Sequence, residues 1–159
     1  MITYELSTVD FNIIRGDLVL LAQQGNFDAI THSCNCFCRM KRGIAPQLAK
    51  AFGCDKFKLE QVFCGSIKKL GNIDFIKVNG VFVINSYMQH HWNEPSRYGI
   101  PFDYDACRLC LRKSNKEFAG SHIGMPWIGC GLAGGDKGVV KKIIEEELAD
   151  CSVTIVEKD

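Results

Sequence analysis

The sequence lacks the marks of a multidomain, disordered or membrane-spanning chain. Only four prolines occur among its 159 residues, and no proline-, glycine- or serine-rich linker or internal repeat interrupts it. We therefore expect a single domain over residues 1–159. No apolar run approaches the roughly 20 residues that cross a bilayer, and no signal peptide is expected at the N-terminus. Hydrophobic residues make up 47% and charged residues 23%, which excludes disorder as the main state.

The sequence also lacks an excess of charge of either sign. Lys and Arg number 19 against 18 Asp and Glu, so the net charge is +1. This balance favours neither stable nucleic-acid binding nor binding to a membrane surface. With no oligomerisation signal in the sequence, a monomer is the expectation.

Cysteine is abundant, with nine residues. The odd number and the missing export signal predict reduced thiols in a cytoplasmic protein rather than a disulfide framework. His32, Cys34, Cys36 and Cys38 suggest zinc, but zinc ligands usually come as two separated pairs. We therefore expect no metal and no cofactor.

Hydrophobic periodicity predicts alternating strands and helices. The expected strands cover residues 11–14, 28–34, 73–77, 81–84, 123–128 and 151–155, and the expected helices cover 18–24, 44–52, 57–63, 102–118 and 139–148. Asn79-Gly80 predicts a hairpin turn. This pattern indicates an α/β fold with a mixed, mostly parallel sheet and helices on both faces. Ligands bind such sheets beyond the carboxyl ends of the strands, which points to loops 35–43 and 129–135.

The second loop has four glycines in seven residues between a predicted strand and a predicted helix. Glycines let the backbone approach a ligand closely, and the N–H groups of such a turn form an anion site. The alternative is a flexible surface turn. The following helix has Lys137, Lys141 and Lys142 at its start and acids at its end, against the preference of the helix dipole. Either these lysines attract phosphate or they belong to a solvated charged face.

His32 is placed at the end of a strand, beside the first loop. Its unperturbed pKa lies near neutrality, which suits a general acid or base. A purely structural histidine is the alternative. The first loop also carries three cations, Arg39, Lys41 and Arg42, which would stabilise negative charge that develops on a substrate.

Three segments, in order along the chain, resemble the signatures of macro domains. They are Gly16-Asp17-Leu18, then Thr31-His32-Ser33-Cys34-Asn35 followed by Gly43-Ile44-Ala45, and Gly129-Cys130-Gly131-Leu132-Ala133-Gly134-Gly135-Asp136. The resemblance spans nearly the whole chain. The run His-Ser-Cys-Asn-Cys is especially similar to the yeast-type ADP-ribose 1″-phosphate phosphatases, in which that histidine is implicated in hydrolysis.

The resemblance implies a three-layer α/β/α sandwich that binds ADP-ribose or ADP-ribose 1″-phosphate. The implied adenine site is Asp17 with Leu18, and Asn35 would orient the distal ribose. The backbone of Gly43 and Ile44 would pack against that ribose and the diphosphate. The diphosphate would lie on Gly129, Cys130, Gly131, Leu132, Ala133 and Gly134. His32 would be the general acid or base, and Asp136 is either a second catalytic group or the N-cap of the last helix.

The sequence also departs from the family pattern. Arg42-Gly43 replaces a doubled glycine, and Lys137 replaces a common aromatic residue. The lysine and the acid of the related glutamate-specific glycohydrolases are absent, with Ser86-Tyr87 and Ala133 at those places. The loop with His90, His91, Trp92 and Tyr98 is a candidate cover for the terminal ribose or the adenine. The favoured function is hydrolysis of ADP-ribose 1″-phosphate. The alternatives are a non-catalytic module that binds ADP-ribose or a related cyclic nucleotide, and removal of ADP-ribose from macromolecules.

Overall fold

The computed structural model of the chain describes residues 10–57 and 63–158. A six-stranded sheet has the strand order β1-β6-β5-β2-β4-β3. The strands are β1 (Phe11–Gly16), β2 (Ala29–Asn35), β3 (Ile73–Val78), β4 (Val81–Gln89), β5 (His122–Met125) and β6 (Ser152–Lys158). The α-helices are α1 (Leu18–Gln23), α2 (Ala45–Phe52), α3 (Tyr104–Glu117) and α4 (Lys137–Glu147), and short 3₁₀ turns cover Cys54–Lys56 and Ile67–Lys69.

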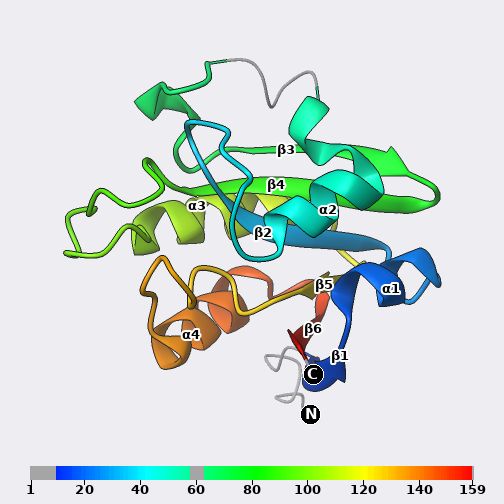
Figure 1. Cartoon of the computed structure of the whole chain (residues 1–159). Helices are drawn as coiled ribbons and strands as arrows, with labels where there is room; N and C mark the ends of the chain where they lie inside the picture. Colours follow the sequence, from blue (N-terminus) through cyan, green and yellow to red (C-terminus); the bar gives the residue numbers. More distant parts are fainter. Residues whose placement is uncertain (1–9, 58–62, 159) are drawn as a thin grey trace, which may run out of the picture.

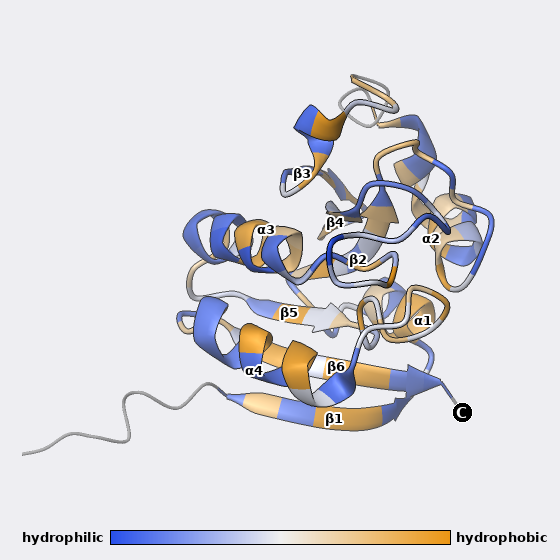
Figure 2. Cartoon of the chain, turned by 90° about the vertical axis from the view of Figure 1, so that its left-hand side faces the viewer, coloured by the Kyte–Doolittle hydropathy of each residue, from blue (hydrophilic) through white to orange (hydrophobic). Residues whose placement is uncertain are grey.

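Helices cover both faces of the sheet, as the alternating pattern predicts. In Figure 2, α1 and α2 lie on one side of the strands and α3 and α4 on the other. A separate apolar cluster fills the space on each side: one contains Leu48 of α2 and the other Leu111 of α3. Every strand pair is parallel except the β3–β4 hairpin. The predicted three-layer α/β/α sandwich is therefore confirmed.

The Asn79-Gly80 hairpin is also confirmed, because both residues have the positive φ that such a turn requires, 50° and 89°. Two strand ends differ from expectation. β4 continues past residue 84 to Gln89, through polar residues that find partners inside the sheet. β5 ends at Met125 instead of residue 128, because Pro126 has no N–H to continue the ladder. The helix expected over 57–63 falls largely on 58–62, outside the described residues.

The sheet divides at its carboxyl edge. β2 pairs with β5 only through Ala29 and Ile30, whereas it pairs with β4 along its whole length. Beyond Ile30 the two middle strands separate, and the loops that follow them leave on either side of the gap (Figure 1). No helix within the described ranges is long and apolar enough to cross a membrane.

Candidate functional site

Two adjoining cavities lie across the carboxyl ends of the strands. The inner cavity, of ≈ 240 Å³, is lined by residues from the end of β2, the loop after it and the glycine loop. The outer cavity, of ≈ 710 Å³, extends to the start of α1. Both are lined by Gly43, Ile44, Pro126, Trp127 and Gly131. They therefore form one cleft, whose size is that of a small-molecule site, about 300–1,000 Å³.

Backbone hydrogen bonds within the glycine loop, and packing against the ring of Phe102, fix the conformation of this loop. Gly135 N–H donates to Gly129 O at 2.7 Å, and Gly134 N–H donates to Gly131 O at 3.1 Å. Gly129 has a φ of +69°, and a Cβ there would overlap the ring of Phe102. The N–H groups of Gly131, Leu132 and Ala133 donate to no acceptor within the described chain. They line the cleft or its rim and remain available to an anion.

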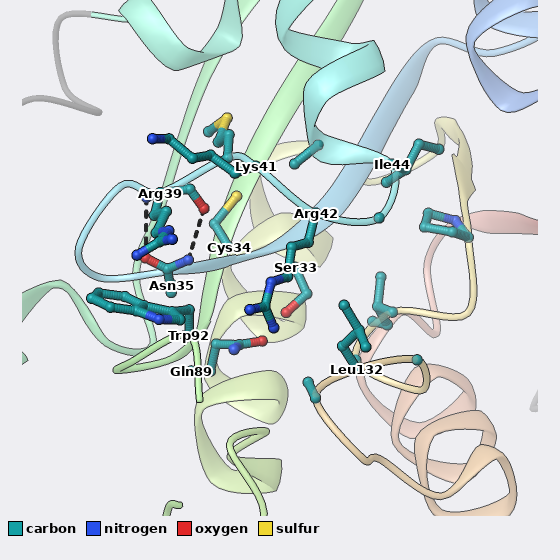
Figure 3. Close-up of a pocket in the computed structure, with 18 of the residues that line it drawn as sticks. Ser33, Cys34, Asn35, Arg39, Lys41, Arg42, Ile44, Gln89, Trp92 and Leu132 are labelled. Carbon is teal, nitrogen blue, oxygen red and sulfur yellow. Dashed lines mark hydrogen bonds between the residues drawn. The ribbon is translucent and has the colours of Figure 1, made fainter. Parts of the chain in front are cut away.

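The inner cavity carries positive charge. Its lining includes Arg39, Lys41 and Arg42 (Figure 3) but no Asp, Glu or His among the described residues. None of the three cations forms an ion pair within residues 10–57 and 63–158. Arg39 lies over the ring of Trp92, with Cζ 4.5 Å from its centroid. An anionic ligand end would therefore find uncompensated positive charge here.

Asn35 lines this cavity, and its side chain also folds the cationic loop. Its Oδ1 accepts from Phe37 N–H at 3.1 Å and from Arg39 N–H at 3.2 Å, while its Nδ2 donates to Arg39 O at 2.9 Å. Figure 3 shows the two bonds between Asn35 and Arg39 as dashed lines. The side chain thus determines where Arg39 lies, a role that the sequence did not predict.

His32 is placed behind the cavity wall rather than in it. The residue is 1% exposed, and its Nε2 lies 2.7 Å from Asn85 Oδ1. Burial lowers the pKa of His32 to about 4, and the hydrogen bond to Asn85 Oδ1 opposes this shift. Cys34, whose Sγ is 3.4 Å from His32 Nε2, separates the ring from the cavity that it lines. Cys34 therefore connects His32 to the lining of the cavity.

The two aspartates predicted as site residues both begin helices. Asp17 is the N-cap of α1 and accepts from Leu20 N–H at 3.1 Å. Asp17 and Leu18 also line the outer cavity. Asp136 accepts from Val139 N–H at 3.1 Å, which confirms it as the N-cap of α4. It is exposed and lines neither cavity.

The reversed charge order of α4 arises largely from its packing against α3. Glu147 accepts from Arg112 Nε at 3.0 Å, and Glu146 pairs with Arg108 at 2.7 Å. Of the three lysines at its start, Lys137 lines the outer cavity, where it lies 3.8 Å from Glu157. The acids at the helix end are therefore explained by cross-helix ion pairs.

The lining also contains polar and aromatic residues that the sequence did not assign to the site. These are Ser33, Gln89 and Trp127, which join Trp92 from the candidate cover loop. Trp127 donates from Nε1 to Glu157 Oε2 at 2.7 Å. Tyr98 instead bonds Asp105 at 2.7 Å and does not line the cleft. The only sequence signal that could have assigned Trp127 and Ser33 to the site is their position near the end of a predicted strand.

The cysteines show no metal-binding geometry. Across residues 10–57 and 63–158, no group of three His, Cys, Asp or Glu side chains lies close enough to hold a metal ion. All nine cysteines belong to these ranges, and none forms a disulfide. Burial raises the pKa of Cys36 to about 12, which keeps that thiol protonated at neutral pH.

Comparison with known proteins gives a clear sequence relative. No family model matches the chain. The chain is 31% identical over 157 residues to the uncharacterized 17.5 kDa protein in the tk–vs intergenic region of enterobacteria phage T4. The match covers 91% of this chain and 94% of that protein.

Solved structures share the fold. A protein of unknown function from Bacteroides thetaiotaomicron is 28% identical, with a TM-score of 0.76 over 94% of this chain and 98% of its own. The macrodomain of Mycobacterium tuberculosis DarG is 20% identical, with a TM-score of 0.66 over 93% and 97%. Thermosipho africanus DarTG in complex with ADP-ribose is 19% identical, with a TM-score of 0.68 over 92% of this chain and 41% of that one. The chain therefore belongs to the family of the phage T4 protein and has the macrodomain fold.

Proposed function

We propose that the cleft binds ADP-ribose. The glycine loop carries this proposal. Its N–H groups at Gly131, Leu132 and Ala133 have no acceptor among the described residues and line the inner cavity, which also carries three cations, and Gly131 continues into the outer cavity that reaches Asp17. A diphosphate needs donors of this kind between two flanking pockets. The fold is shared with DarTG in complex with ADP-ribose and with a Trypanosoma brucei macrodomain in complex with the same ligand, 18% identical with a TM-score of 0.61.

In this proposal the ligand runs the length of the cleft. The adenine occupies the outer cavity beside Asp17 and Leu18, and the diphosphate lies on the loop of Gly129, Cys130, Gly131, Leu132, Ala133 and Gly134. The distal ribose enters the inner cavity beside Gly43, Ile44 and Asn35. The supporting observation is that Gly43 and Ile44 line both cavities, as residues at the middle of an extended ligand should.

Hydrolysis of ADP-ribose 1″-phosphate is the activity that we propose for the same cleft. The favouring observation is the group of cations Arg39, Lys41 and Arg42 at the inner end, none of which pairs with an acid within the described ranges. Water would attack the phosphorus, the bond from phosphorus to the 1″-oxygen would break, and that oxygen would leave as the hydroxyl of ADP-ribose. The cations and loop N–H groups would stabilise the added charge. His32 would influence proton transfer only through its contact with Cys34. It would therefore be a positioning residue.

Calorimetric titration with ADP-ribose, followed by an assay of phosphate release, tests both levels of the proposal. We expect binding, and a rise of the melting temperature with ligand concentration. We expect His32→Ala to lower phosphate release by up to about 10²-fold, the cost of misplacing groups near the reacting atoms, while changing ADP-ribose affinity by less than about tenfold. Absence of binding would overturn the proposal.

Binding without phosphate release would favour the non-catalytic module. Release of ADP-ribose from modified protein or nucleic acid, with no phosphate release, would favour the other alternative, removal of ADP-ribose from macromolecules. Turnover that survives His32→Ala would direct attention to Asp136, whose exposed carboxylate would then need to reach the substrate from outside the cavity.

A further inference from the structure

Ser33, in β2, has a hydroxyl with no hydrogen-bond partner within the described chain. Its Oγ is also shielded from water. The neighbouring polar groups are already engaged: Ser86, opposite Ser33 in the register of β4, has its Oγ 2.7 Å from the hydroxyl of Thr31. A buried hydroxyl without a partner lowers the stability of the free protein. A ligand that supplies the missing partner would explain why such a group is tolerated.

Ser33 lines the inner cavity together with Gln89 and Arg42. Figure 3 shows the Ser33 oxygen on the side of β2 toward which the Arg42 guanidinium extends. The Gln89 amide is fixed, because its Nε2 donates to His91 O at 3.1 Å. Arg42 is exposed and forms no ion pair with any described residue. No ion pair with a described residue therefore holds its side chain in place, and a ligand that reaches Ser33 could also contact Arg42.

We infer that Ser33 is a specificity-determining residue whose hydroxyl donates a hydrogen bond to a phosphate monoester carried on the distal ribose. The inference rests on the proposed function. An uncharged ligand end would leave Arg39, Lys41 and Arg42 uncompensated, whereas a phosphate monoester supplies both the negative charge and acceptor oxygens. Asn35 is a weaker candidate for this role, because its donor atom Nδ2 already donates to Arg39 O at 2.9 Å. A hydrogen bond to a charged oxygen, shielded from water, is stronger than a neutral one.

The two tryptophans of the chain, Trp92 and Trp127, both line the inner cavity, so their fluorescence reports its occupancy. Stopped-flow titrations, read before turnover, compare ADP-ribose with ADP-ribose 1″-phosphate. For Ser33→Ala we expect the affinity for the phosphorylated ligand to fall about tenfold or more, and that for ADP-ribose to change by less than about threefold.

The matched control is Ser114→Ala. Ser114 has the other shielded, unpartnered hydroxyl of the described chain, but it lies in α3 and lines none of the cleft. This variant should bind both ligands as the wild type does. Arg42→Gln should lose affinity for the phosphorylated ligand selectively, as Ser33→Ala does.

The outcomes separate the two levels of inference. A wild-type protein that binds neither ligand overturns the proposed function, and this inference with it. A wild-type protein that binds ADP-ribose, combined with an unchanged ligand preference in Ser33→Ala, overturns the role of Ser33 alone. An equal loss of affinity for both ligands in that variant also overturns it, because it would show a general effect on the cavity.

Discussion

The contact between His32 and Asn85 fixes the tautomer of the buried ring. Asn85 Nδ2 donates to Cys54 O and to Asp74 Oδ1, each at 3.0 Å, so Asn85 Oδ1 is the atom that faces His32 Nε2 at 2.7 Å. Because that oxygen only accepts, the ring carries its proton on Nε2. Nδ1 is left as the basic atom, 3.8 Å from Cys34 Sγ.

This burial predicts a pH-dependent stability. The unfolded chain takes up a proton at His32 near pH 6.5, whereas the native ring stays neutral until about pH 4. The stabilisation is therefore complete above pH 6.5 and is lost as the pH falls toward 4. Between about pH 7 and about pH 4.5, we expect this group to remove about 2–3 kcal/mol of unfolding free energy. Urea unfolding of wild type and His32→Gln at both pH values measures it.

His32→Gln should lose less stability than wild type over the same pH interval. His122→Gln is the control, because His122 lies at the start of β5 and bonds Thr154 rather than the buried network. Parallel pH dependences for wild type and His32→Gln would contradict a buried neutral ring.

Asp17 has two roles that substitution can separate. As the N-cap of α1 it accepts a backbone hydrogen bond, which alanine removes at a cost of about 1 kcal/mol in stability and asparagine retains. We expect Asp17→Asn to keep the melting temperature and Asp17→Ala to lower it. If the carboxylate receives the adenine amino group, both variants should bind ADP-ribose more weakly by calorimetry. Wild-type affinity in Asp17→Asn would remove the adenine assignment.

The close packing of Gly129 on Phe102 predicts a sharp contrast within one loop. Gly129→Ala adds a methyl group that overlaps the Phe102 ring, at a φ of +69°, so we expect a loss of about 2 kcal/mol or more in unfolding free energy. Gly131→Ala adds its methyl group to open space and should leave stability nearly unchanged. Thermal melting of the two variants provides the comparison. Equal melting temperatures would contradict it.

Glu147 joins α4 to α3 through Arg108 and Arg112. The hydrogen bond from Arg112 is the main cause of a lowered Glu147 pKa. Its stabilisation is therefore present above the pKa of the unfolded side chain and is lost as the solution is acidified. We expect Glu147→Gln to cost about 1 kcal/mol at neutral pH, because these partners are partly exposed. Glu145→Gln, at an exposed position of the same helix, should cost less in denaturant unfolding.

Local signals were sufficient for most of the architecture. Asn79-Gly80 determines its own turn, and Gly53, with a φ of +69°, ends α2 where the sequence indicated. The end of β4 was not predictable in this way, because Ser86 and Tyr87 look like loop residues. They are buried only because Thr31 and Asp74 supply partners at 2.7 Å and 2.6 Å.

The site was predicted by position more reliably than by role. Glycines and strand ends marked the cleft correctly, since Asp17, Asn35 and Gly131 all line it. The direction of each side chain depends on partners from distant segments. His32 lies behind the wall because Asn85 binds it there, and Ser33 was overlooked because its distinguishing feature is a missing partner. A sequence alone shows neither relationship.

The short pairing between β2 and β5 creates an edge in the interior of the sheet. An edge on the outside of a protein is a template for another strand, but this one is flanked by the two loops of the cleft, which leave room for a small molecule. Met125, the residue in register with Thr31, does not pair with it, and Pro126, the next residue, has no N–H and itself lines both cavities. Because β2 and β5 pair through only two residues each, the space for a ligand exists at the expense of sheet hydrogen bonds.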